Sequence, residues 1–235
     1  MPKCFIIIFL MIGNIIWGQN LLNQTVFEGN INHLNKIIKI EQLVEFSKND
    51  LRILRNTIFA KYGYKFVSND LKEHFSQFSW YNGIVSNVDN KLTIIDKENI
   101  ELIQKIERNY PENNKFINDL IGNWYMFGAV ASEGMDSLST IISRGEQLQI
   151  LPNGIYIIHC RAHVRNEIVF YGLWSLKNYT FETVPIGEHI GHGIVPTYGK
   201  VDNFYISSVY SIDGNEYPSI SPFNHGSWVK ELNKK

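Results

Sequence analysis

The chain has 235 residues, with 22 lysines and arginines against 23 aspartates and glutamates, so its formal net charge is −1. This balance gives no electrostatic basis for binding nucleic acid, which excludes that class of partner from our expectations. Apolar residues make up 44% of the sequence and aromatic residues 13%, enough for the chain to build a core of its own.

Residues 1–18 have the order of a cleavable secretory signal. Lys3 is followed by the uncharged stretch 4–17, and Gly18 then supplies a small residue. The stretch is shorter than the roughly 20 apolar residues that a membrane-spanning helix needs. We therefore expect a mature chain that begins at Gln19, is secreted or periplasmic, and makes no stable membrane insertion after cleavage. A retained anchor is the alternative.

Residues 19–110 predict a small helical module. Its first clear helix has apolar side chains at helical spacing, namely Leu51, Leu54, Ile58 and Tyr62. Ser47, with Asp50 three residues later, can cap the start of this helix, and Gly63 stands where a left-handed residue would end it. A second helix is predicted near residues 68–78, and a third begins at a Thr93–Asp96 cap and ends before Pro111.

The first of these helices is part of a longer motif. Residues 51–66 read L-R-I-L-R-N-T-I-F-A-K-Y-G-Y-K-F, and Trp80-Tyr81 and Asn99-Ile100 follow in register. This stretch resembles the YARHG domain, a small extracellular domain of bacteria. The sequence departs from the family pattern where Phe59, Lys61 and Tyr62 replace tyrosine, arginine and histidine. The resemblance implies a compartment and an architecture, and it implies no activity.

Arg55 is the most informative residue of the motif, because it lies at the edge of the apolar stripe and an unpaired buried charge is very costly. The structural interpretation is a tie to a carboxylate, or to backbone carbonyls at the Trp80 turn, which Asn56 could also hold. The functional interpretation is capture of an anionic group on a partner. The candidate binding residues are Arg55, Asn56, Lys61, Tyr62, Trp80 and Tyr81.

Residues 111–118 predict a linker, and residues 119–235 predict an antiparallel β domain. Strands are expected near residues 122–129, 146–151, 154–161, 167–175, 178–184, 203–211 and 226–232, and a further one at 138–142. Hairpin turns are expected at 152–154 and 176–178. Short sequential strands without crossover helices favour a meander closed into a barrel, and a sandwich is the alternative.

This half resembles the small lipocalin-like domains of secreted bacterial proteins. The resemblance rests on Gly122-Asn123-Trp124, on residues 153–156 and on Gly172-Leu173-Trp174. It implies that Trp124 packs in the core at the closed end of a barrel. We also assign a structural role to Trp174 in this half and to Gly63 in the helical module. The fold class is therefore predicted as α+β, a small helical module followed by an antiparallel β-barrel.

The histidines and Cys160 do not form a convincing chemical site. His159 and His163, four residues apart on one strand, would stand roughly 13 Å apart and cannot share an ion. His189 and His192 are interpreted as solvated loop residues, and Cys160 as a structural thiol. We expect no catalytic residue, no cofactor and no metal.

These observations predict an exported, non-catalytic binding protein of the bacterial cell envelope or exterior. In the first hypothesis the barrel holds a small, partly apolar ligand in an open cavity. In the alternative the barrel is filled, and the YARHG-like module binds a protein or an envelope polymer. A hydrolase centred on His189 is the least favoured hypothesis.

Overall fold

The computed structural model describes residues 21–112, 115–127, 146–161, 167–186, 199–201, 204, 206–212, 215–221 and 227–230. The signal predicted over residues 1–18, the strand expected at 138–142, and His163, His189 and His192 lie outside these residues. The chain divides into two compact units, residues 1–108 and residues 109–235. No helix in the described ranges has the length and apolar character needed to cross a membrane.

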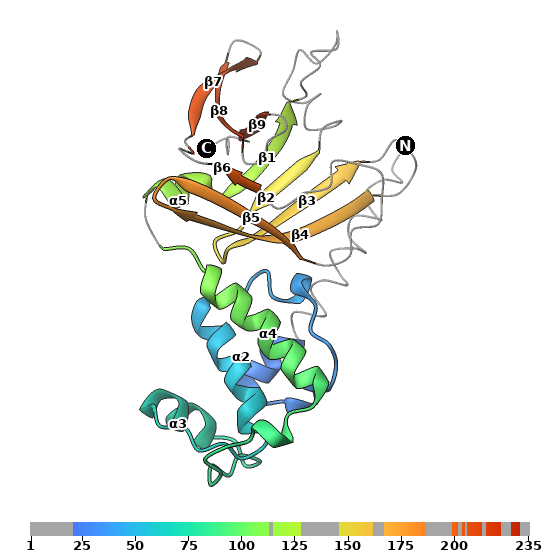
Figure 1. Cartoon of the computed structure of the whole chain (residues 1–235), viewed down its shortest axis with the longest axis vertical. Helices are drawn as coiled ribbons and strands as arrows, with labels where there is room; N and C mark the ends of the chain where they lie inside the picture. The colour runs from blue at the N-terminus through green and yellow to red at the C-terminus, as the bar shows by residue number, and fades with distance from the viewer. Residues whose placement is uncertain are drawn as a thin grey trace. The chain divides into compact units, whose positions relative to one another are not determined.

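The first unit is helical (Figure 1). Residues 21–28 are helical and are followed by η1 (Ile31–Asn35), η2 (Ile40–Gln42), α2 (Lys48–Ala60), α3 (Asn69–Ser76), η3 (Asp89–Lys91) and α4 (Ile94–Asn109). The predicted cap of α2 is present, since the Asp50 N–H donates to Ser47 Oγ and the Ser47 N–H donates to Asp50 Oδ2, both at 3.2 Å. Gly63 follows the helix with φ +80°, the left-handed conformation predicted for it.

The buried side of α2 is the one predicted by its helical spacing, and α4 buries isoleucines at the same kind of spacing. Leu51, Leu54 and Ile58 of α2 and Ile103 and Ile106 of α4 are all fully buried. Tyr62, predicted on the same stripe as Leu51, instead lies in the turn after α2, because the helix ends at Ala60.

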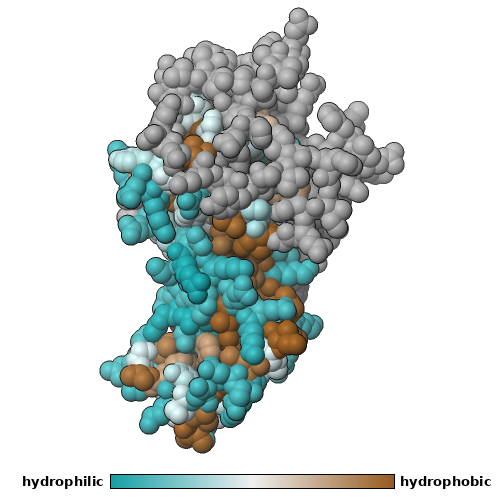
Figure 2. Space-filling view, in the orientation of Figure 1, coloured by the Kyte–Doolittle hydropathy of each residue, from teal (hydrophilic) through white to brown (hydrophobic). Residues whose placement is uncertain are grey.

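Aromatic side chains form a second packing centre in this unit, which we call the aromatic cluster; its rings are Phe59, Tyr64, Phe66, Phe75, Phe78, Trp80 and Tyr81. Phe66 and Phe75 stack at its centre, with ring centroids 4.9 Å apart. Figure 2 shows hydrophobic residues reaching the surface at the end of this unit where Figure 1 places α3.

The second unit begins with α5 (Lys115–Leu120) and continues as a nine-stranded antiparallel sheet. The strands are β1 (Gly122–Phe127), β2 (Gln147–Ile150), β3 (Ile155–Arg161), β4 (Glu167–Lys177), β5 (Thr180–Ile186), β6 (Gly199–Val201), β7 (Ser207–Ile212), β8 (Asn215–Ile220) and β9 (Ser227–Lys230). Their order across the sheet is β6-β5-β4-β3-β2-β1-β9-β8-β7.

The predicted barrel is not confirmed. β6 and β7 stand at the two ends of the strand order, and no pairing between them is present among the described residues, so the described sheet is open. The predicted linker 111–118 also needs correction, because α5 occupies its second half and contributes Ile117 and Leu120 to the core of this unit. In its described residues the unit thus combines a short helix with an antiparallel sheet.

Two features of the sheet differ from the sequence prediction. β6 and β8 were not expected, and β8 contains Pro218, a residue that argues against a strand interior. Pro218 is accommodated opposite Ser208, where the register of β7 shifts. The turn predicted at 176–178 lies slightly later, at Asn178 and Tyr179, which both take positive φ values.

The core of the second unit is filled by large side chains on one face of the sheet. Trp124, Leu148, Ile158 and Phe170 stand in one cross-strand row from β1 to β4, and all four are buried. The other large rings of this core are Tyr156, Trp174, Phe181, Phe204 and Trp228. Cross-strand rows of this kind are the usual source of sheet stability.

Candidate functional site

Arg55 makes a two-point ion pair that joins α2 to α4. Its Nε lies 2.6 Å from Glu107 Oε2 and its Nη2 lies 3.3 Å from Glu107 Oε1. Both side chains are largely buried, with exposed fractions of 23% and 14%. The tie to a carboxylate is therefore present, but the partner is a residue of α4 and not a group of the Trp80 turn.

Asn56 also differs from its predicted role at that turn. Its Nδ2 donates to the Arg52 carbonyl one helical turn earlier, at 2.7 Å. Its Oδ1 has no hydrogen-bond donor within the described part of the chain. Asn56 therefore keeps an acceptor that a ligand can use.

Arg55 and Asn56 line a cavity of about 310 Å³, which we call the motif pocket. Its other lining residues are Phe59, Tyr64 and the segment 86–89. Arg55 and Asn56 are held on α2 by the capped helix, and Tyr64 is fixed by its bridge to Val85. The pocket thus combines a guanidinium, an amide oxygen, the Asp89 carboxylate and two aromatic rings.

Lys61 and Tyr62 bind one carboxylate, that of Asp96 in the first turn of α4. Lys61 Nζ lies 2.5 Å from Asp96 Oδ1, and the Tyr62 hydroxyl donates to Asp96 Oδ2 at 2.7 Å. The Asp96 side chain is fully buried. It also accepts from the Thr93 N–H and hydroxyl, at 2.9 and 2.8 Å, in the predicted helix cap.

This network shifts two pKa values in opposite directions. Burial by itself raises the pKa of Asp96, but the hydrogen bonds from Lys61, Tyr62 and Thr93 outweigh it and hold that pKa below its usual range. Burial raises the pKa of Tyr62, and the hydrogen bond to Asp96 and the negative charge of Asp96 raise it further, to about 12. At neutral pH the site is a carboxylate held by a cation and a protonated phenol, which is a structural tie between the turn after α2 and the first turn of α4.

Trp80 and Tyr81 belong to the aromatic cluster. Trp80 stacks on Phe78 with ring centroids 5.6 Å apart and an interplanar angle of 5°, and the Tyr81 hydroxyl donates to the Tyr64 carbonyl at 2.9 Å. The indole N–H of Trp80 is buried and has no hydrogen-bond acceptor among the described residues. These contacts assign both residues mainly to packing.

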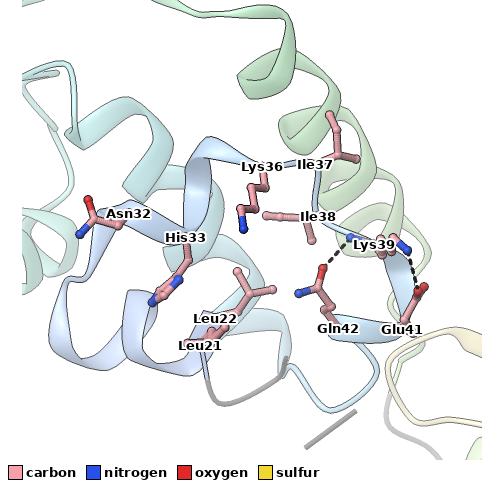
Figure 3. A pocket seen from close by; sticks show the side chains of 10 residues that line it. All are labelled: Leu21, Leu22, Asn32, His33, Lys36, Ile37, Ile38, Lys39, Glu41 and Gln42. Atoms are coloured by element: carbon pink, nitrogen blue, oxygen red, sulfur yellow. Dashed lines mark hydrogen bonds and ion pairs between the residues drawn. The ribbon is translucent and has the colours of Figure 1, made fainter. Parts of the chain in front are cut away.

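A second, larger cavity of about 520 Å³ lies at the start of the helical unit, and we call it the N-terminal pocket (Figure 3). It is lined by residues 21–22, 32–33, 36–39 and 41–42. None of these residues belongs to the candidate set read from the sequence. The only signal that could have pointed to it is the combination of Leu21-Leu22 with the later run of lysines and isoleucines at 36–39.

In the second unit, the two tryptophans singled out by the sequence are fully buried. The Trp124 indole N–H donates to the Leu120 carbonyl at 2.8 Å, and that of Trp174 donates to the Leu151 carbonyl at 3.1 Å. Both are core residues, the role expected of them. His159 and Cys160 lie on β3.

Sequence reasoning missed the two carboxylates that give the motif its structure. Glu107 and Asp96 lie 52 and 35 residues after Arg55 and Lys61, so no local pattern connects the partners. Asp96 was recognised only as a helix cap. A buried cation at the edge of a stripe predicts that some carboxylate exists, and only the packing of α4 on α2 shows which one.

Comparison with known protein families gives a match within the first unit. Residues 33–108 match the YARHG domain, and this range contains α2, α3 and α4 together with Arg55, Lys61, Tyr62 and Trp80. No curated protein and no solved structure has a significant match to the chain.

Proposed function

We propose that this chain is an exported, non-catalytic binding protein that holds a hydroxyl-rich envelope polymer, a glycan, through the motif pocket of its YARHG domain. The observation that carries the proposal is that Arg55 and Asn56, two residues of the family motif, line an open cavity of about 310 Å³. Export is supported by the order of residues 1–18, which is that of a secretory signal.

The polar groups of the pocket suit hydroxyl groups. Arg55 uses Nε and Nη2 on Glu107, and its Nη1 has no acceptor within the described residues. Asn56 Oδ1 and the exposed Asp89 carboxylate supply acceptors beside this donor. A hydroxyl group both donates and accepts hydrogen bonds, so an array that alternates donors and acceptors matches a row of hydroxyls.

The apolar part of the pocket suits the carbon face of a sugar ring. Phe59 and Tyr64 are both partly exposed, with ring centroids 6.2 Å apart and planes inclined by 55°. Rigid aromatic side chains offer large contact area at a small entropic cost. A glycan presents the apolar carbon faces of its sugar rings and also their hydroxyl groups. It can therefore contact both the aromatic rings and the polar groups of this pocket.

The first hypothesis from the sequence, a small, partly apolar ligand in a lipocalin-like barrel, has less support. It requires a closed sheet around an open cavity. Trp124, Trp174 and Trp228 are each at most 1% exposed and fill the described face of the sheet. If the interior of the sheet domain is filled by side chains, the alternative hypothesis applies, in which the helical module binds the partner.

Sedimentation of the mature chain with insoluble cell-wall glycan tests the proposal. The variant Ser86→Trp places a bulky ring in the motif pocket, and we expect it to lower the bound fraction by about tenfold or more. Ser76→Trp is the matched control, because Ser76 is an exposed serine at the end of α3 and does not line the pocket.

Two further measurements separate the alternatives. Asp89→Asn removes an acceptor charge from the pocket rim and should weaken binding by about threefold to fivefold, whereas Glu98→Gln on the exposed side of α4 should not. Unchanged binding by Ser86→Trp would contradict the proposal. Retention of the wild-type chain by envelope protein, and not by purified glycan, would point to a protein partner.

A further inference from the structure

The N-terminal pocket is a separate cavity from the motif pocket and shares no lining residue with it. Its volume of about 520 Å³ lies within the roughly 300–1,000 Å³ typical of small-molecule sites. A site of this size can hold a ligand much smaller than a polymer.

The apolar wall of this pocket is rigid. Leu22 and Ile38 line it and are only 2% and 3% exposed. The backbone on either side of residue 37 is fixed by one side chain of α4, because the Ile38 N–H donates to Asn99 Oδ1 at 2.7 Å and Asn99 Nδ2 donates to the Lys36 carbonyl at 2.9 Å. The wall therefore exists before any ligand arrives.

Two of the polar groups at the pocket, the Lys36 ammonium and the Gln42 amide, can donate to a ligand. Figure 3 shows the Lys36 side chain directed toward Leu22 and Ile38. Within the described residues no carboxylate lies in ion-pair distance of the Lys36 ammonium. Gln42 uses its Oε1 to accept from the Lys39 N–H at 2.9 Å, which leaves its amide N–H groups for a ligand.

The remaining charges do not cancel this donor character. Lys39 and Glu41 lie at the outer edge of the pocket and face each other at 4.0 Å, the limit of an ion pair. The His33 ring is held by Asn30, whose Oδ1 accepts from the Asn32 N–H and whose Nδ2 therefore faces His33 Nε2 at 3.2 Å. The one cation of the pocket that has no counter-charge is Lys36, among the residues that the structure describes.

We infer that the N-terminal pocket binds a small amphipathic carboxylate, with its apolar body against Leu21, which is 41% exposed beside the buried Leu22 and Ile38, and its carboxylate on Lys36 and the Gln42 amide. The free cation favours an anion, and the apolar wall excludes an anion that has no hydrocarbon body. A medium-chain fatty acid and an aromatic acid share this chemistry. This site does not depend on the glycan proposal, because the two pockets have no residue in common.

Titration calorimetry of the mature chain with decanoate tests the inference. We expect saturable binding of decanoate, about fivefold weaker binding of decanol, and no binding of acetate. Phenylpropionate in a parallel titration distinguishes an aromatic acid from an aliphatic one. Lys36→Gln should weaken decanoate binding by about fivefold and make it insensitive to salt.

The control variant is Lys72→Gln, which removes the same charge from an exposed position on α3 that does not line the pocket. It should bind decanoate as the parent does. Equal binding of decanoate and decanol, an unaffected Lys36→Gln variant, or no saturable binding of either acid would each overturn the inference. The inference would also be overturned if the protein sedimented with phosphatidylglycerol vesicles but did not bind the free acids. That result would favour a membrane surface as the partner.

Discussion

In the helical unit, α4 is tied to the preceding segments by charged and polar side chains, whereas the described core of the sheet unit is held by ring packing and strand pairing. Arg55–Glu107, Lys61–Asp96 and the Asn99 hydrogen bonds all join α4 to earlier residues. In the sheet unit the largest buried side chains are three tryptophans whose surroundings are apolar. Both units have apolar cores, but only in the helical unit do buried ion pairs join the described elements to one another.

The difference follows from the size and shape of the elements. The helices of the first unit are short, and helices of this length are marginal without tertiary contacts. Buried charges that lose a partner are strongly destabilising, so each tie makes the unit sensitive to a single side chain. The sheet spreads its stability over many cross-strand pairs, and one polar change should matter less there.

The largest effect is expected from Asp96→Ala. This change removes the partner of Lys61 and Tyr62 and the cap of α4 together, and a broken buried pair costs about 3–5 kcal/mol. Because a domain has only about 5–15 kcal/mol of stability, we expect the helical unit to open or unfold. Hydrogen exchange should show loss of amide protection in α2 and α4 and normal protection in β3 and β4.

Asp70→Ala is the matched control for Asp96→Ala. Asp70 also pairs with a cation, Arg52 at 2.5 Å, but its side chain is 61% exposed, and exposed pairs contribute little. Its variant should keep the protection of α2 and α4. Equal losses in α4 and β4 on Asp96→Ala would mean that the two units do not differ in the way described above.

A smaller effect is expected from Arg55→Leu. Glu107 then loses its partner in a largely buried position, which should cost about 2–3 kcal/mol of helical-unit stability. The double variant with Glu107→Leu should recover part of this loss, because no charge is left unpaired. Denaturant melts followed by helix circular dichroism measure both. A single variant as stable as the parent would remove the structural role of Arg55 and strengthen its role in the motif pocket.

The smallest effect is a pH dependence confined to the helical unit. The pKa of Asp96 is lowered on folding, so its contribution is complete above about pH 4 and is lost as pH falls below that value. The pKa of Tyr62 is raised to about 12, so its contribution is present below about pH 10 and is lost as pH rises through about 12. Amide protection of α4 measured from acid to alkaline pH should fall at both ends.

Tyr62→Phe is the control for the alkaline limb. This variant should keep the acid limb and lose only the alkaline one, since it has no phenol to ionise. Parallel falls in the protection of β3 would show that the pH dependence belongs to the whole chain.

The sequence predicted best those features that depend on neighbouring residues. Each helix cap joins residues three apart, namely Ser47–Asp50 and Thr93–Asp96. The stop after α2 needs only the left-handed backbone conformation of Gly63. The helical spacing of Leu51 and Leu54 likewise identified the buried face. The partner of Arg55 could not be read in the same way, because it lies 52 residues away.

In the sheet unit the same limit applies to topology. Seven strands follow the predicted segments, since alternation and turn residues are local signals. β8 was hidden by Pro218, which is tolerated only because the opposing strand shifts its register there. Closure of the sheet depends on which strands meet at its two ends, and no local pattern specifies that. The N-terminal pocket escaped prediction for a related reason, because one of its lining segments, residues 36–38, is held in place by Asn99, more than 60 residues later in the chain.

The ties of α4 also determine the order in which the helical unit can fold. A chain emerges from the ribosome, or from an export channel, with its N-terminus first. The segment at Lys36–Ile38 and the turn at Lys61–Tyr62 must then wait for Asn99 and Asp96, which follow 63 and 35 residues later. Until α4 appears, Arg55 of α2 and Lys61 in the turn after it have no carboxylate partner from α4. The unit should therefore stay unfolded through most of its synthesis and close in a late step, when α4 supplies Asp96, Asn99 and Glu107 together.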